Sequence, residues 1–168
     1  MAYTYSKIAT YTVGSGGISS VWFLNIPQTY TDLVLKGSAR TTQAAHYGVI
    51  TIYPNGISSG LTGKNLYGGD NVVESDTSTG VAYVSGNNAT ANTFGTFQTY
   101  FPNYTGTNYK SMSSEGAAES NSTTNTYMKL GATLWSNTQA ITSLQILPTA
   151  INFMQYSTFH LYGIKAEL

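Results

Sequence analysis

Alternation of apolar and polar residues with a period of two is the feature that most limits how this chain can fold. In the stretch 127–134, apolar side chains alternate with a more polar set, and the apolar positions are Met128, Leu130, Ala132 and Leu134. Successive side chains of an extended strand point to opposite faces, so this pattern predicts a half-buried β-strand. No window of about 11 residues shows the apolar spacing of a capped amphipathic helix. The chain is therefore predicted to be all-β, with at most one short helical turn around 61–65.

Further segments rich in β-branched or aromatic residues are also predicted to be strands. They are Tyr5–Val13, Ile18–Leu24, Asp32–Ala39, His46–Tyr53, Val81–Ser85, Thr96–Phe101, Ser111–Ala117, Ile141–Leu147 and Tyr156–Ile164. Glycine-rich and Asn-rich turn segments separate them, among them 14–17, 54–56, 68–71 and 85–88. Many short strands without helices are typical of a β-sandwich, of which the jelly roll is a common form. The sequence predicts a single antiparallel β-sandwich domain, residues 1–168, with a jelly-roll-like topology.

Charge and cysteine content exclude several classes of function. The 168 residues carry seven basic and seven acidic side chains, and only 8% of the residues are charged. Nucleic-acid binding needs clustered Lys and Arg, whereas this chain has a single arginine, Arg40, so no nucleic-acid partner is expected. Cysteine is absent, which excludes disulfides, thiol nucleophiles and Cys-ligated metals. A surface without net charge resists self-association poorly, which is compatible with a protein that assembles.

Targeting signals are not recognisable in the sequence. The first residues, Met1 to Lys7, lack a basic segment followed by an apolar stretch. No later segment approaches the ~18 uninterrupted apolar residues of a membrane-spanning helix. We therefore expect synthesis in the cytoplasm without membrane insertion.

Candidate catalytic residues are few. Ser58 lies in Gly56-Ile57-Ser58-Ser59-Gly60, which matches the G-x-S-x-G pattern of a nucleophile elbow, but no helix is predicted after it. His46 and His160 are the side chains with an ordinary pKa suited to general base catalysis, and both lie within predicted strands, between apolar or aromatic neighbours. The favoured interpretation is therefore a chance match for the serine and hydrogen-bonded sheet residues for the two histidines. No catalytic residue is assigned, and an enzyme is not expected.

Three carboxylates lie close together in the sequence, at Asp70, Glu74 and Asp76. Oxygen ligands of this kind bind calcium, but the ligand order and central glycine of an EF-hand are missing. A solvated loop is the favoured interpretation, a calcium loop is the alternative, and a pair of glycosidase carboxylates cannot be judged from sequence. No metal site and no cofactor are assigned.

Aromatic residues are the more informative signal, because Tyr, Trp and Phe dominate contact surfaces. Trp22 and Trp135 lie in or beside apolar strands and are interpreted as core residues. Tyr104 and Tyr109 lie in the loop-like segment 102–109, where burial is less expected. Exposed tyrosines of this kind suit either a subunit interface or a platform on which a sugar stacks.

Several segments resemble a family of small virion structural proteins of tailed bacteriophages, of the type found in cyanophages and marine phages. The resemblance lies in scaffold segments distributed over most of the chain outside the middle, about 58–95. These segments are Tyr5–Ala9, Ile26–Leu35, Phe101–Tyr104, Leu134–Leu144 and Asn152–Ile164. They carry no catalytic motif, so they identify a kind of protein rather than a site.

The resemblance implies a β-sandwich component of the virion. The favoured interpretation is a capsid decoration (cement) protein, a homotrimer that binds the major capsid protein on the outer surface of the head. A first strand that begins within a few residues of Met1 leaves little room for the shaft of a fibre, which favours this interpretation. The alternative is a tail-fibre-associated adhesin domain that binds host surface glycan. The expected subunit or capsid contacts are the terminal and loop residues Tyr3, Tyr5, Tyr104, Tyr109, Lys165 and Leu168.

Overall fold

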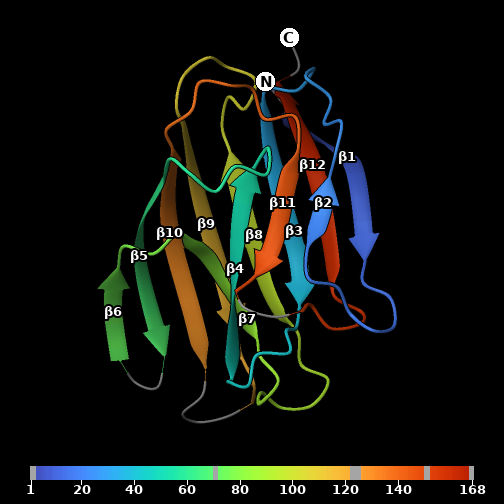
Figure 1. Cartoon of the computed structure of the whole chain (residues 1–168), viewed down its shortest axis with the longest axis vertical. Helices are drawn as coiled ribbons and strands as arrows, with labels where there is room; N and C mark the ends of the chain where they lie inside the picture. Colours follow the sequence, from blue (N-terminus) through green and yellow to red (C-terminus); the bar gives the residue numbers. More distant parts are fainter. Residues whose placement is uncertain (1–2, 70–71, 122–125, 150–151, 167–168) are drawn as a thin grey trace.

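The computed structural model describes residues 3–69, 72–121, 126–149 and 152–166, which form twelve antiparallel strands in two sheets (Figure 1). The large sheet has eight strands, in the spatial order β1 (Tyr3–Thr12), β12 (Thr158–Ala166), β3 (Asp32–Ala39), β8 (Gly95–Phe101), β9 (Lys110–Ala118), β10 (Tyr127–Trp135), β5 (Leu61–Gly69) and β6 (Val72–Asp76). The small sheet has four, in the order β2 (Val21–Phe23), β11 (Leu144–Pro148), β4 (Tyr47–Pro54) and β7 (Gly80–Ser85).

The prediction of an all-β antiparallel sandwich is confirmed. The small sheet covers one face of the large sheet, and no helix occurs among the described residues (Figure 1). Two hairpins, β9–β10 and β5–β6, widen the large sheet beyond β8. The remaining eight strands form the facing sets β1-β12-β3-β8 and β2-β11-β4-β7. The jelly-roll form stays a prediction, with which this order of eight strands is compatible.

The sequence-based expectation for the two segments that form the hairpin β5–β6 was wrong. Residues 61–65 form part of β5 instead of a helical turn, and residues 72–76 form β6 instead of a solvated loop. The register pairs Leu66 with Leu130 on one side and with Ser75 on the other. The glycines and polar residues of β5 give it only a weak strand signal. It forms a strand because it pairs with β10.

The core lies between the two sheets and receives large side chains from both. Its largest fully buried members include Trp135, Phe101, Phe153, Phe159, Leu35 and Ile50. The prediction that Trp135 is a core residue is confirmed. The same prediction for Trp22 is wrong, because Trp22 is 41% exposed and its ring packs over Gly56 in the turn after β4. Trp22 lies in a three-residue strand whose neighbours Val21 and Phe23 point into the core, so alternation turns the indole outward.

Strand β7 packs unusually close to the large sheet. A Cβ atom at Gly116 would lie 2.7 Å from the Ala82 Cβ and from the Tyr83 carbonyl oxygen, and one at Gly95 would lie 2.6 Å from the Val84 Cα. Both positions therefore accept only glycine without a shift of the backbone. All six residues of β7 are buried as a result of this contact.

Close packing of β7 also determines which face of β10 is buried. The middle of the inward face of β10 carries Lys129, Gly131 and Thr133, all of them polar or small, between the aromatic rings of Tyr127 and Trp135 at its two ends. Beneath β7, Ser114 donates a hydrogen bond to the Val81 carbonyl oxygen at 2.7 Å. The alternating apolar residues of β10 point outward, and Met128 is 56% exposed. Alternation in β10 is confirmed, but the polar side faces the interior.

Arg40 organises the long connection between β7 and β8. Its guanidinium group is buried and donates hydrogen bonds to the carbonyl oxygens of Asn87, Ala89, Thr90 and Thr93, at 2.7–3.1 Å. Burial lowers the pKa of this guanidinium, whose donors are used inside the fold. The single arginine of the chain thus has a structural role.

We predict that Gly116→Ala destabilises the protein, because the new methyl group must displace β7. Overpacking of this kind costs about 1–3 kcal/mol in free energy of unfolding, which urea denaturation measures. Gly14→Ala is the matched control, since no atom lies within 4 Å of the position that its new Cβ would take. The control is expected to change stability by less than about 1 kcal/mol. Equal stability of the two variants would contradict the close packing of β7.

Candidate functional site

The candidate site is a seam where the hairpin β5–β6 extends beyond the β7 edge of the small sheet (Figure 1). Two surface depressions, of about 260 and 550 Å³, lie along the seam and share Tyr83. The smaller is lined by Tyr47, Tyr67, Gly69, Val72, Glu74, Tyr83 and Tyr127. The larger is lined by Val49, Thr51, Tyr53, Asp76, Ser78, Thr79, Gly80, Tyr83, Lys129, Leu147, Pro148 and Thr149. We refer to these two depressions together as the seam.

Four tyrosines from four different strands meet in the seam. The Tyr47 ring lies 4.6 Å from the Tyr83 ring and 4.5 Å from the Tyr127 ring, between centroids. The Tyr67 ring meets Tyr83 edge to face at 5.8 Å. Such tilted and edge-to-face contacts are the favoured arrangements of aromatic pairs. Tyr83 is buried, whereas Tyr47, Tyr67 and Tyr127 are partly exposed and line the surface.

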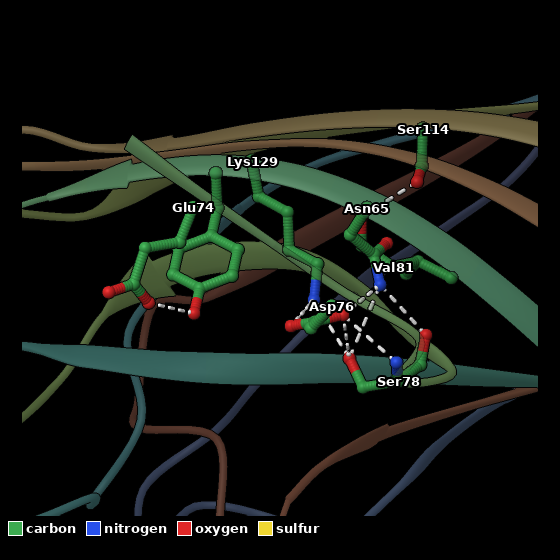
Figure 2. A network of polar contacts seen from close by, with 8 residues as sticks. Asn65, Glu74, Asp76, Ser78, Val81, Ser114 and Lys129 are labelled. Carbon is green, nitrogen blue, oxygen red and sulfur yellow. Dashed lines mark hydrogen bonds and ion pairs between the residues drawn. The ribbon is translucent and has the colours of Figure 1, made fainter. Parts of the chain in front are cut away.

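Lys129 lies behind the tyrosines and is almost completely buried, with 1% of its side chain exposed. Its Nζ donates to Ser78 Oγ at 3.1 Å, lies 3.8 Å from Asp76 Oδ2, and stands 5.1 Å from the Tyr83 ring centroid. Figure 2 shows Lys129, Asp76 and Ser78 converging, from β10, from β6 and from the segment that joins β6 to β7. A buried ammonium group is tolerated when it is paired and hydrogen-bonded, and this network supplies both.

Asp76 is the acceptor on which this network converges. Its Oδ1 accepts hydrogen bonds from Asn65 Nδ2 at 2.5 Å, from Ser78 Oγ at 2.9 Å and from the Ser78 backbone N–H at 2.9 Å (Figure 2). Burial opposes ionisation of Asp76, but these hydrogen bonds and the charge of Lys129 outweigh it and lower its pKa. Burial lowers the pKa of Lys129, and the Asp76 carboxylate opposes that effect.

The hydroxyl groups of Tyr67 and Tyr83 have raised pKa values and remain protonated near neutral pH. Tyr67 Oη donates to Glu74 Oε2 at 2.5 Å, and this hydrogen bond raises the pKa of Tyr67 to about 12. Burial raises the pKa of Tyr83 above its ordinary value. The exposed part of the seam therefore offers aromatic rings, hydroxyl groups and the carboxylate of Glu74.

Ser78 and Lys129 do not form a nucleophile and its base. The Lys129 ammonium donates a hydrogen bond to Ser78 Oγ, and the Ser78 hydroxyl donates one to Asp76 Oδ1. A general base must instead accept the proton of the nucleophile. The arrangement therefore suits recognition of a ligand better than covalent catalysis.

A second surface lies on the opposite, outward face of the same strands. Five exposed apolar side chains from β10, β5 and β6 form what we call the outer patch: Met128, Leu130, Leu134, Leu66 and Val73. The register pairs Leu130 with Leu66, and Gly68 with both Met128 and Val73, which places these positions side by side on one face. A depression of about 320 Å³ adjoins the patch, and its lining includes Lys36, Gln98 and Glu115. Contiguous exposed apolar surfaces are, as a general rule, more frequent at interaction sites than elsewhere on a monomer.

The interface residues expected from the sequence do not form one cluster. The expectation that Tyr104 is exposed is wrong, because this residue is completely buried and its hydroxyl donates to the Pro27 carbonyl oxygen. Tyr5 and Tyr109 are exposed, as is Lys165, which pairs with Thr4 at the junction of β12 and β1. Tyr5 lies beside Tyr162 and under the Lys36 ammonium, whereas Tyr109 precedes β9, beyond β12, β3 and β8.

Two of the expected contact residues fall at the limits of the described chain. Tyr3 belongs to β1, where it pairs with Ala166, and its side chain lies outside the description. Leu168 lies outside the described residues.

The candidate catalytic residues lie apart from one another. Ser58 is exposed in the loop before β5, so a strand follows it instead of the helix that a nucleophile elbow requires. His160 Nδ1 hydrogen-bonds Thr10 Oγ1 at 3.0 Å across β12 and β1, and His46 directly precedes β4. Glu74 and Asp76 belong to β6, while Asp70 lies outside the described residues. Within the described ranges, no three His, Asp or Glu side chains converge on a metal position.

The seam residues Tyr47, Tyr67, Tyr83, Tyr127 and Lys129 were not predicted as a site. They come from four strands, and only the sheet register and the position of β7 bring them together. One available signal was the inward set of β10, in which Tyr127 and Lys129 alternate with apolar residues.

Comparisons of the chain with protein-family models, curated proteins and solved structures find no match. In the part of the chain that the structure describes, no helix has the length and hydrophobicity needed to cross a membrane.

We predict that Asp76→Asn lowers the free energy of unfolding at neutral pH by about 1–3 kcal/mol, because it leaves the buried Lys129 ammonium without its counter-charge. The folded-state pKa of Asp76 lies below its unfolded value, so its stabilising effect is complete above about pH 4 and is lost as the pH falls further. The difference between wild type and variant should therefore shrink in acid. Urea denaturation at several pH values measures it.

Glu115→Gln is the control for this prediction, since Glu115 is an exposed carboxylate on the outward face of the large sheet. It should leave stability nearly unchanged across the same pH range. A difference between wild type and Asp76→Asn that does not change with pH would contradict the assigned role of the Asp76 carboxylate.

Proposed function

We propose that this protein is a capsid decoration protein of a tailed bacteriophage, which binds the outer surface of the head lattice and stabilises it. The observation that carries the proposal is the outer patch, an apolar surface that strands β10, β5 and β6 present to solvent. The resemblance of the scaffold segments to small virion proteins supports the same function. In this proposal the partner is the major capsid protein, and the location is the outer surface of the virion.

The outer patch suits a contact with a preformed protein lattice. Its side chains stand on a hydrogen-bonded sheet, so binding requires little ordering of the backbone. Lys36 and Glu115 lie at the adjoining depression and can orient a partner of complementary charge. A ligand that binds only the assembled lattice stabilises it by mass action.

A homotrimer is the assembly we propose for this role. Three copies that each contact a neighbouring capsid subunit gain through effective concentration, so each patch needs only modest affinity. The absence of net charge lowers the electrostatic cost of bringing copies together.

A second candidate function, a tail-fibre-associated adhesin that binds host glycan, is favoured by the aromatic seam. It predicts a different abundance. A decoration protein is present in numbers comparable to the major capsid protein, whereas a tail component is present in few copies. Densitometry of purified virions should give a copy number comparable to that of the major capsid protein. A copy number far below it would favour the adhesin.

We predict that Leu130→Lys weakens binding to purified capsids about tenfold or more, since it places a charge in the centre of the outer patch. Leu130 is 48% exposed on a strand, so the fold should be preserved, as circular dichroism can verify. Co-sedimentation with capsids measures the affinity.

Leu24→Lys is the matched control for this variant. Leu24 is also an exposed leucine, with 63% of its surface accessible against 48% for Leu130. It follows β2 and lies outside the patch. The control should bind capsids as the wild type does. Equal binding by the Leu130 variant would show that the patch is not the contact surface.

A further inference from the structure

The residues that line the seam have the composition of a ligand site. Neither the fold nor the outer patch depends on the two depressions of the seam. Its floor is aromatic, through Tyr47, Tyr67 and Tyr127 around the buried Tyr83. Its rim carries hydroxyl groups and a carboxylate, including Thr79, Thr149 and Glu74. Binding sites for small molecules combine an apolar or aromatic surface with a few polar groups that orient the ligand in this way.

We propose that the seam binds a neutral oligosaccharide. The inference goes beyond capsid decoration and holds whether the protein lies on the head or on the tail. A sugar ring presents C–H groups on its faces, which pack against aromatic rings, and hydroxyl groups on its edge, which need hydrogen-bond partners. Partly exposed tyrosines satisfy both requirements, since their rings are apolar and their hydroxyls are polar.

The charges of the seam select against acidic ligands. Of the residues that line the two depressions, Lys129 is the one cation, and its ammonium group is turned toward Ser78 and Asp76 inside the fold. Glu74 is exposed, and its Oε2 is held by Tyr67 (Figure 2). A uronate, a sialylated chain or a phosphate would meet this carboxylate without a compensating free cation. Neutral sugar hydroxyls, in contrast, can donate to it.

The length of the seam favours several sugar units. The two depressions meet at Tyr83, and the larger is lined by the hydroxyl-bearing side chains of Tyr53, Thr79 and Thr149. A chain of sugars can therefore rest one ring on the tyrosines and extend its next units along the hydroxyl groups. One sugar alone would use only part of this surface.

The test titrates the full chain with neutral hexasaccharides of glucose, mannose and galactose, and with an oligogalacturonate of equal length, by isothermal calorimetry. We expect at least one neutral oligosaccharide to bind at millimolar or lower concentration, and the oligogalacturonate not to bind. Tyr47→Ala should weaken neutral binding about tenfold. Tyr162→Ala is the control, since Tyr162 is partly exposed like Tyr47 but lies in β12 outside the seam, and it should bind as the wild type does.

Glu74→Lys separates a change of specificity from misfolding. This variant should bind the oligogalacturonate that the wild type rejects, and a misfolded protein would not gain such binding. Failure of every neutral oligosaccharide to bind at millimolar concentration would overturn the proposal. So would wild-type affinity in Tyr47→Ala, or an unchanged preference in Glu74→Lys. Co-sedimentation of Tyr47→Ala with capsids should equal that of wild type, so loss of sugar binding and loss of decoration are separate results.

Discussion

The close approach of β7 to the large sheet is the constraint on which the rest of the molecule depends. Because Gly95 and Gly116 have no side chains, β7 lies directly against β8 and β9. Beneath β7, β10 turns Lys129, Gly131 and Thr133 inward, each of them polar or small. That orientation buries Lys129, whose partners are Asp76 and Ser78, and Asn65 in turn donates a hydrogen bond to Asp76. The same orientation leaves the apolar residues of β10 exposed.

The sequence was sufficient to predict the fold class, because period-two alternation and turn residues are local signals. It could not predict which face of β10 is buried. Alternation separates Met128 and Leu130 from Lys129, but the choice of inner face depends on β7, which lies more than forty residues earlier in the sequence. The hairpin β5–β6 was missed for a related reason. Its glycines and carboxylates give a loop composition, and pairing with β10 makes β5 a strand.

The candidate sites were harder to predict than the strands, because burial and register are not local properties. Tyr104 and Tyr109 lie in one turn-rich segment, yet Tyr104 is buried through its contact with Pro27, and Tyr109 is exposed. The four tyrosines of the seam are spread from Tyr47 to Tyr127, and nothing in their sequence neighbourhoods distinguishes them from the other tyrosines. Once the register and the position of β7 are known, their convergence follows, since Tyr83 belongs to β7 and the other three rings contact its ring.

The two surfaces occupy opposite faces of the same strands. In β5, Leu66 belongs to the outer patch and its neighbour Tyr67 to the seam; in β10, Leu130 and Lys129 divide in the same way. Because neighbouring side chains of a strand point to opposite faces, a partner on the outer patch leaves the seam accessible. Attachment to a lattice and binding of a sugar are therefore compatible in one molecule. The arrangement also makes the two surfaces separable by mutation, since a substitution on one face changes no side chain on the other.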